Sequence, residues 1–271
     1  MNRKSEVIFF DDFTGKELDR KRWNVEVTGP VYNQEQQAYV DSRETIYLIP
    51  GADQGANGAL VLHPRWRPGT ETVDGVRFDF ISGRINTRGK VGFTYGSISA
   101  RIRLSAGVGL WPAFWALGFG VWPGCGEIDI MENVGAPDWV SAAVHGPGYS
   151  GDAGLANNYY FQPGEDIAGW HVYAVDWLPS GEMIFKVDGR LIYRVTYPMI
   201  EFFGGWAFDN EKYLILNFAL GGAYPFKVNG VRVPYFGLPS ETVVKIQNND
   251  ARMAVDWVST KIGRASCRER V

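Results

Sequence analysis

Short runs in which hydrophobic and polar residues alternate, separated by glycine-rich turns, account for most of this chain. Because successive side chains of a β-strand point to opposite faces, a period of two predicts strands with one buried face. The dipeptide Asp188-Gly189 joins two such runs and predicts a tight hairpin. The predicted strands are Glu6–Phe10, Ala59–His63, Phe80–Thr87, Gly96–Leu104, Ala113–Leu117, Glu127–Asn133, Val140–His145, Trp170–Leu178, Glu182–Val187, Arg190–Thr196, Tyr213–Ala219 and Ala251–Val258.

Long helical patterns are absent from the sequence, and only Phe203–Phe208 is expected to form a turn or two of helix. Gly51–Gly58 and Gly222–Gly237 are predicted to be loops. The composition favours the same class of fold, since 33 Gly and 14 Pro in 271 residues allow frequent turns. We therefore predict an all-β sandwich or barrel, with a single domain over residues 7–262. Residues 263–271 break the pattern and are interpreted as a disordered end or a vector-derived remnant.

The charge and cysteine content exclude several classes of protein. Lys and Arg number 27 against 30 Asp and Glu, without a basic block, so neither a nucleic-acid nor a membrane-surface partner is expected. Cys125 and Cys267 cannot build a disulfide framework or a zinc motif, and Cys125 is expected to be a small buried residue. The apolar run Val7–Phe10 is too short for a signal core or a membrane span. Either the protein is intracellular or a leader is missing from this chain.

The segment 126–133, Gly-Glu-Ile-Asp-Ile-Met-Glu-Asn, carries three carboxylates in an otherwise apolar context. Its β-branched neighbours predict a buried or half-buried strand. In a regular strand Glu127 and Asp129 share a face, whereas Glu132 has the opposite parity. A β-bulge at Ile130–Met131 would add one residue and return Glu132 to the face of the other two acids.

Acids aligned on one face of a strand could catalyse the cleavage of a glycosidic bond. With the bulge, Glu127 and Glu132 are about four strand steps apart, roughly 13 Å between Cα atoms. Side chains that lean together would approach the carboxyl separation of about 5–5.5 Å that retaining glycosidases use, which is too short for the inverting arrangement. The charge of Asp129 between them would help keep one neighbour protonated, as a general acid requires. The alternative is a solvated acidic face on an edge strand.

Two tryptophans precede the acids in the segment 111–115, Trp-Pro-Ala-Phe-Trp. Trp111 and Trp115 have the same parity, so both indoles would lie on one face of an extended segment. The flat indole can cover the C–H face of a pyranose while its N–H binds a hydroxyl group. The alternative is that both tryptophans belong to the core.

A predicted hairpin turn after the acidic strand brings His145 opposite Glu127, on a face with the small residues Ser141 and Ala143. Small residues leave room for a ligand, and the imidazole could donate to the middle acid or to a substrate hydroxyl. His63 and His171 lack such neighbours and are predicted to be structural. Because the histidines are scattered, a histidine-based zinc site is not expected, and no phosphate loop or nucleophile elbow is found.

In these motifs the chain resembles glycoside hydrolase family 16, specifically its laminarinase-type members with a bulged acidic strand. The resemblance covers nearly all of Phe10–Val258. The motifs follow in the family's order: Asp11-Asp12-Phe13, Leu18-Asp19 with Trp23, 82–87 (Ser-Gly-Arg-Ile-Asn-Thr), 95–102, 110–115, 126–132, Val144-His145-Gly146, 170–177, Leu216-Asn217, Gly221-Gly222 and Asp256-Trp257.

The resemblance implies a β-jelly-roll sandwich of two antiparallel sheets with a concave, concanavalin-like substrate cleft, a retaining double displacement, and secretion. It implies Glu127 as the nucleophile, Glu132 as the acid/base and Asp129 as the assisting acid. Catalysis would need no cofactor. The positions that match the family's substrate cleft are Asn33, Arg84, Trp111, Trp115, His145 and Asn217.

Many members of that family bind a structural calcium ion far from the cleft. The matching positions here would be Asp256, the carbonyl of Gly58 and the region of Asp12. A site built largely on backbone carbonyls leaves little trace in a sequence.

We therefore expect an extracellular, monomeric enzyme that cleaves β-1,3-glucan internally, with its leader absent from this chain. The partner would be the polysaccharide substrate. Two enzymatic alternatives remain: a hydrolase of mixed-linkage glucan, galactan or another polymer, and a transglycosylase. A third is a lectin-like jelly roll that only binds sugar, although such a module has no use for three aligned acids. Subsite loops decide which polymer is bound.

Overall fold

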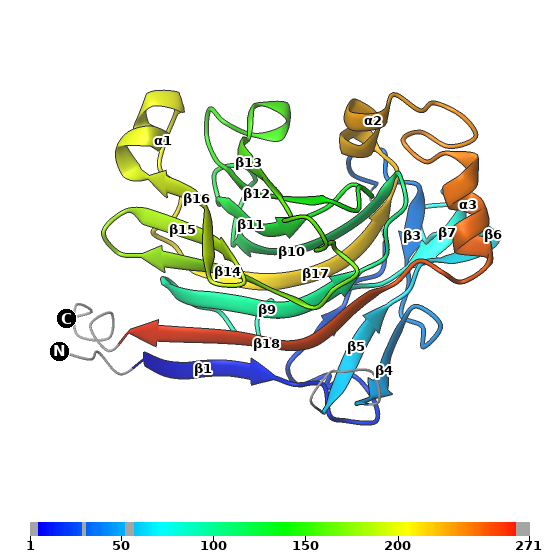
Figure 1. The fold of residues 1–271 in the computed structure, drawn as a ribbon, viewed down its shortest axis with the longest axis horizontal. Helices are drawn as coiled ribbons and strands as arrows, with labels where there is room; N and C mark the ends of the chain where they lie inside the picture. The colour runs from blue at the N-terminus through cyan, green and yellow to red at the C-terminus, as the bar shows by residue number, and fades with distance from the viewer. Residues whose placement is uncertain (1–4, 29–30, 52–56, 264–271) are drawn as a thin grey trace.

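The computed structural model describes residues 5–28, 31–51 and 57–263. Two large curved sheets lie one above the other and form the body of the molecule (Figure 1). One sheet has the spatial order β16 (Arg190–Thr196), β15 (Glu182–Val187), β14 (His171–Leu178), β9 (Gly96–Leu104), β18 (Met253–Gly263), β5 (Gly58–Leu62) and β4 (Ile46–Pro50), with β1 (Ser5–Asp11) also paired to β18.

The second large sheet carries the acidic strand. Its order is β13 (Leu155–Tyr160), β12 (Trp139–His145), β11 (Glu127–Glu132), β10 (Leu110–Gly118), β17 (Lys212–Leu220), β8 (Arg84–Asn86) and β2 (Asn24–Val25). A smaller third sheet consists of β3 (Gln37–Tyr39), β7 (Arg77–Ser82) and β6 (Arg65–Glu71), and its β3–β7 pair is parallel. The predicted pair of antiparallel sheets is therefore confirmed, with this mixed sheet added.

The core lies between the two large sheets. On β9, Ile98, Ala100 and Ile102 are fully buried, and the residues between them are partly exposed, which is the predicted alternation. β17 is different, because all of its residues from Lys212 to Leu220 are buried. One face of β17 meets the core, and side chains of the functional site cover the other.

The predicted strand Phe80–Thr87 is wrong as a single element, because β7 and β8 belong to different sheets. The chain changes sheets at Gly83, where a Cβ atom would lie 2.6 Å from Cγ1 of Ile46 and 3.0 Å from the carbonyl oxygen of Thr45. Only glycine fits such a close approach. The hairpin prediction at Asp188-Gly189 is confirmed: both residues have positive φ (50° and 76°), as a type I′ turn requires.

The helices lie outside the predicted positions. The predicted helical turn at Phe203–Phe208 is wrong, since α1 spans Tyr197–Phe203 and ends before Gly204; a proline in its first turn favours that start. The predicted loop Gly222–Gly237 contains α2 (Ala223–Asn229), bounded by glycines that themselves indicated a loop. The sequence analysis also missed α3 (Ser240–Gln247), the short helix η1 (Gly151–Ala153) and strands β2, β3, β4, β6 and β13.

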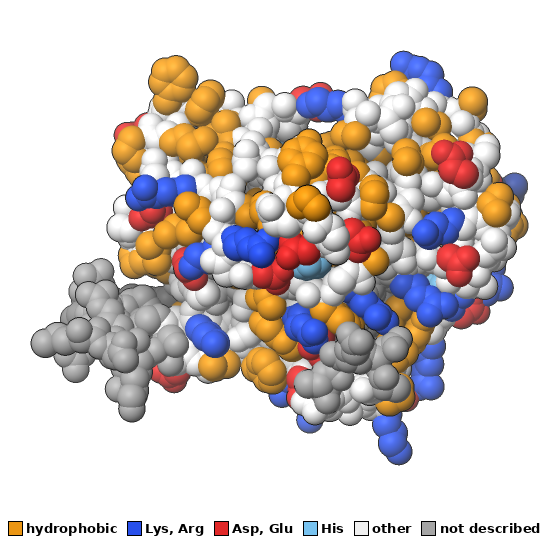
Figure 2. Space-filling model, in the orientation of Figure 1, with side chains coloured by type: hydrophobic (Ala, Val, Ile, Leu, Met, Phe, Trp, Pro, Cys, Tyr) orange, Lys and Arg blue, Asp and Glu red, His pale blue; other side chains and the backbone are white. Residues whose placement is uncertain are grey.

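Other predictions concern the ends and the surface. Cys125 is buried, as expected, whereas Cys267 and the rest of 264–271 lie outside the described residues. On the face shown in Figure 2, positive and negative side chains are interspersed, and hydrophobic side chains gather over α1. Among the described residues, none of the helices has the length and apolar character needed to cross a membrane.

Candidate active site

The acidic strand β11 lies in the interior of its sheet, between β10 and β12. Across to β10, Met131 pairs with Phe114 and Asp129 pairs with Trp115, so Ile130 is an extra residue. The side chains of Ile130 and Met131 are both buried in the core, with 1% and 0% of their surface exposed. The predicted bulge is thus confirmed, and the alternative of an edge strand is wrong.

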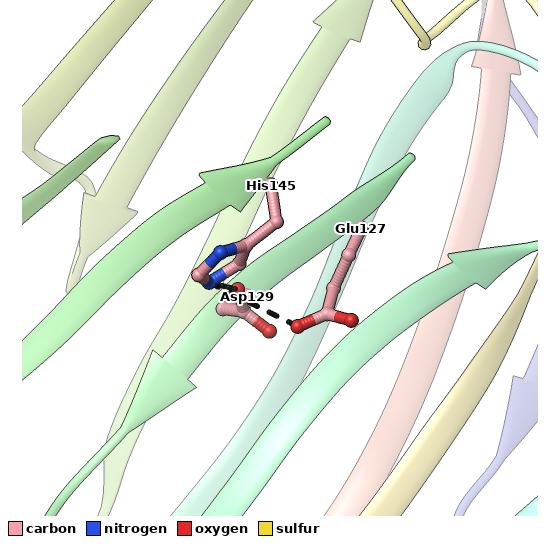
Figure 3. Close-up of side chains that lie close together, drawn as sticks. All are labelled: Glu127, Asp129 and His145. Atoms are coloured by element: carbon pink, nitrogen blue, oxygen red, sulfur yellow. Dashed lines mark ion pairs between the residues drawn. The ribbon is translucent and has the colours of Figure 1, made fainter. Parts of the chain in front are cut away.

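Three of the predicted side chains converge on one point (Figure 3). His145 on β12 lies opposite Glu127 on β11, as expected. Its Nε2 atom is 3.3 Å from Oδ2 of Asp129 and 3.9 Å from Oε1 of Glu127. The small residues Ser141 and Ala143 stand opposite Glu132 and Asp129, so β12 adds little bulk beside the acids.

Each of the two outer acids accepts a hydrogen bond from an indole. Trp111 Nε1 donates to Oε1 of Glu132 at 2.9 Å, so this predicted tryptophan does lie beside the acids. Trp122 Nε1 donates to Oε2 of Glu127, also at 2.9 Å. The sequence analysis missed Trp122, because it lies in the loop before β11, where strand parity gives no orientation; its closeness to the acidic motif was the only available signal.

Burial makes ionisation of the three carboxyl groups costly. It raises the pKa of Glu127 to about 8, together with the charges of Asp129 and Glu132, while the electrostatic interaction with His145 and the Trp122 hydrogen bond lower it. Burial and then the charge of Glu132 hold the pKa of Asp129 well above its usual range. Burial likewise raises the pKa of Glu132, against the hydrogen bond from Trp111. Ionisation of the cluster is therefore less favourable than that of free carboxyl groups, which favours the protonated acid that general-acid chemistry requires.

A second group of side chains lies beside the acids, on β10, β17 and β8 of the same sheet and on the chain at and just before β3 of the small sheet. Trp115 Nε1 donates to Oδ1 of Asn217 at 2.7 Å, and Asn217 Nδ2 donates to the hydroxyl oxygen of Tyr39 at 3.1 Å. The Tyr39 hydroxyl donates to Oε2 of Glu35 at 3.0 Å. The guanidinium of Arg84 lies 5.1 Å from the ring centre of Trp115 and 5.8 Å from that of Tyr39. Three predicted cleft residues are thus joined in one polar and aromatic wall.

This wall also contains acids that the sequence analysis missed. Arg84 Nε lies 2.9 Å from Oε2 of Glu26, and Glu35 is surrounded by hydrogen-bond donors, the closest of them Gln37 Nε2 at 2.7 Å. Burial nevertheless raises the pKa of Glu35. The predicted residue Asn33 is exposed and its side chain hydrogen-bonds to Glu35, so it lies at the outer end of the wall. Such loop acids have no periodic pattern that identifies them.

Two of the three predicted calcium positions, Asp256 and Gly58, lie on strands that pair with each other, and Gly58 contacts the chain next to Asp12. β18 pairs with β5 up to Val255 and with β1 from Val258 onward, and Asp256 is the extra residue of a bulge between them. Gly58 begins β5, and a Cβ atom there would lie 2.7 Å from the carbonyl oxygen of Phe13.

The predicted ligands at these positions are a carboxylate and backbone carbonyl oxygens, which are the ligand types that calcium usually binds. The side chain of Asp256 is only 4% exposed, and its Oδ2 atom already pairs with Arg101 Nη1 at 2.6 Å.

The remaining histidines are structural, as predicted. His171 Nδ1 lies 2.7 Å from Oδ2 of Asp188, and its Nε2 lies 2.8 Å from the carbonyl oxygen of Asp166. His63 is buried, and its Nδ1 lies 2.9 Å from the hydroxyl of Tyr47. Among the described residues, the group whose side chains could jointly hold a metal is Glu127, Asp129 and His145, with donor atoms within 4.8 Å of one another. The same carboxylate oxygens and imidazole nitrogen would transfer protons in acid–base catalysis.

Comparisons with known proteins agree with this fold and site. Residues 31–211 match the profile of the family described as "Glycosyl hydrolases family 16". The beta-glucanase of Rhodothermus marinus is 36% identical over 233 residues, which cover 81% of this chain and 77% of that protein. The endo-beta-1,3-glucanase of Pyrococcus furiosus superposes with a TM-score of 0.82 at 33% identity, covering 96% of each chain. The laminarinase catalytic domain of Thermotoga maritima MSB8 gives 0.79 at 30% identity, covering 95% of this chain and 98% of that one. The resemblance and the predicted jelly roll are confirmed, and the chain belongs to glycosyl hydrolase family 16.

Proposed function

We propose that this protein is an endo-acting β-1,3-glucanase that retains the anomeric configuration. The observation that carries the proposal is the bulge in β11, which places Glu127 and Glu132 on one face with Asp129 between them. Each outer acid is oriented by an indole N–H. The relatives named above, two of them endo-β-1,3-glucanases or laminarinases by name, support the choice of substrate.

The reaction takes two steps. Glu132 protonates the glycosidic oxygen while a carboxylate oxygen of Glu127 attacks the anomeric carbon, and the glycosyl-enzyme forms as the leaving sugar departs. Glu132, now deprotonated, takes a proton from water, and that water hydrolyses the glycosyl-enzyme. Asp129 lies between the two acids, where it hydrogen-bonds to Glu127 and interacts electrostatically with Glu132.

A substrate panel tests this function. Reducing sugar should be released from laminarin faster than from lichenan, agarose or xyloglucan, with oligosaccharides of several lengths as early products. NMR of the first product should show the β-anomer. Absence of turnover on laminarin, or an α-anomer as the first product, would rule out the proposal, and binding without turnover on every polymer would favour the lectin-like alternative.

Trp115→Ala should weaken substrate binding more than it destabilises the protein. Its indole is half-buried and is held by Asn217 and Arg84 at the wall of the site. We expect the KM for laminarin to rise about tenfold, equivalent to about 1.4 kcal/mol. Core tryptophans cost about 3–5 kcal/mol of stability when truncated, so Trp177→Ala, at a fully buried position, is the matched control. A large fall in Tm for Trp115→Ala with unchanged KM would assign Trp115 to the core instead.

We also propose that calcium binds at the junction of Asp256, Gly58 and the Asp12 segment. Removal of an ion present at 100 times its Kd costs about 2.7 kcal/mol, so dialysis against a chelator should lower Tm by roughly 5–11 °C. Asp256→Asn should abolish this dependence on the chelator. If chelation leaves the Tm of the wild type unchanged, Arg101 alone neutralises Asp256 and the calcium site is wrong.

Three further properties belong to the same proposal. We infer one catalytic domain over residues 7–262, a monomer in solution, and an extracellular location, where a polymeric substrate is accessible. Light scattering of the purified chain tests the monomer, and limited proteolysis tests the domain limits.

A further inference from the structure

The loop between β10 and β11 is a compact turn. The amide of Cys125 donates to the carbonyl oxygen of Val121 at 3.0 Å, and the amide of Gly126 donates to that of Pro123 at 3.0 Å. These bonds satisfy backbone groups within the loop itself and limit its possible conformations.

A buried lysine attaches this loop to the protein body. Lys212 on β17 is fully buried, and its Nζ donates to the carbonyl oxygens of Cys125 at 2.8 Å and Ala207 at 3.1 Å. Gly126 has a φ of 70°, and a Cβ atom there would lie 2.1 Å from the carbonyl oxygen of Ala207. The loop is therefore fixed at the residue immediately before Glu127.

Trp122 projects from this fixed loop onto the acid cluster. Its side chain donates to Oε2 of Glu127, and its ring centre lies 6.3 Å from that of His145. The residue is nevertheless 46% exposed, so core packing does not account for its position. The other carboxylate oxygen of Glu127, Oε1, is the one that faces His145.

We propose that Trp122 is a positioning residue for the nucleophile: its indole N–H holds Oε2 of Glu127 and leaves Oε1 free to attack the anomeric carbon. This inference rests on the function proposed above, because it assigns Glu127 the role of nucleophile. Trp111 makes the corresponding bond to the acid/base Glu132, so the two acids have separate indole donors from different parts of the chain.

The bond also bears on the charge of Glu127. A carboxyl group attacks only when it is ionised, and hydrogen bonds to the charged form favour ionisation. Burial, Asp129 and Glu132 oppose ionisation of Glu127, whereas His145 and Trp122 favour it. Loss of the indole N–H should raise the pKa of Glu127 and move the acid limb of the pH–rate profile to higher pH.

Trp122→Phe tests the inference, because it keeps an aromatic face and removes the N–H. With an aryl β-laminaribioside as substrate, the acid limb of kcat/KM should move up by about one pH unit, so that activity below the limb falls about tenfold. KM should change little. Trp206→Phe is the matched control, since Trp206 also donates to a carboxylate, Oδ1 of Asp209. It should leave the acid limb in place, and an unchanged limb in Trp122→Phe would overturn the inference.

A second measurement does not depend on the substrate. The side-chain carboxyl carbon of Glu127, identified by its loss in Glu127→Gln, can be titrated by ¹³C NMR in the wild type and in Trp122→Phe. A higher pKa in Trp122→Phe supports the inference, and equal values refute it. A wild type that leaves β-1,3-glucan intact would refute the proposed function, and the titration would still decide the role of Trp122.

Discussion

Replacing Glu127 with serine is expected to lower turnover of β-1,3-glucan by more than about 10⁴-fold, because the glycosyl-enzyme cannot form without its nucleophile. Glu127 shares the face of Asp129 and Glu132, and its carboxyl group is oriented by Trp122. Steady-state assays on laminarin measure the loss.

The variant should remain folded. The carboxyl group of Glu127 is unfavourable to bury and to ionise where it lies, so removing it takes away a polar group with a high desolvation cost along with one hydrogen bond. We expect an unchanged Tm within about 3 °C and preserved binding of laminari-oligosaccharides by calorimetry. Near-wild-type turnover would show that Glu127 is not the nucleophile. A large fall in Tm would show that the lost activity comes from unfolding and not from loss of the nucleophile.

Glu132→Ala is expected to remove general-acid catalysis, a loss of about 10²–10⁴-fold on laminarin. Substrates whose leaving group needs no proton, such as dinitrophenyl β-laminaribioside, should form the glycosyl-enzyme at close to the wild-type rate. The comparison of kcat/KM between polymer and activated glycoside measures this difference.

Azide separates the two acids by stereochemistry. In Glu132→Ala it should attack the glycosyl-enzyme and yield a β-glycosyl azide, because two displacements occur. In Glu127→Ser it can attack only the substrate itself and should yield the α-glycosyl azide, the product of a single displacement. The opposite pattern would exchange the roles of Glu127 and Glu132.

The acidic strand was predictable because its evidence is local. The spacing of Glu127, Asp129 and Glu132, with two apolar residues before the last, requires a bulge if all three acids share a face. β10 and β12 show that bulge at the predicted place. The register of His145 opposite Glu127 follows from the same strand and one tight turn.

The changes of sheet were not predictable from the alternating pattern. Residues 80–87 continue with the same period across Gly83, although the chain passes there from one sheet to another. The reason is tertiary, since the backbone approaches Ile46 and Thr45 too closely for any side chain. The helix α2 was not predicted for a related reason. Its flanking glycines cap the helix in this structure, and glycines are equally common in loops.

The sequence by itself determined the class of fold, the acidic strand and the family motifs from which we propose the catalytic acids, because each depends on residues close together in the chain. Only the tertiary structure decided what surrounds those acids. Trp122, Glu35 and Tyr39 lie on loops or short strands, where no periodicity gives the direction of a side chain. Their contacts arise when distant segments pack together. The hydrogen bonds that orient the carboxyl groups and shift their pKa values therefore form only in the folded protein.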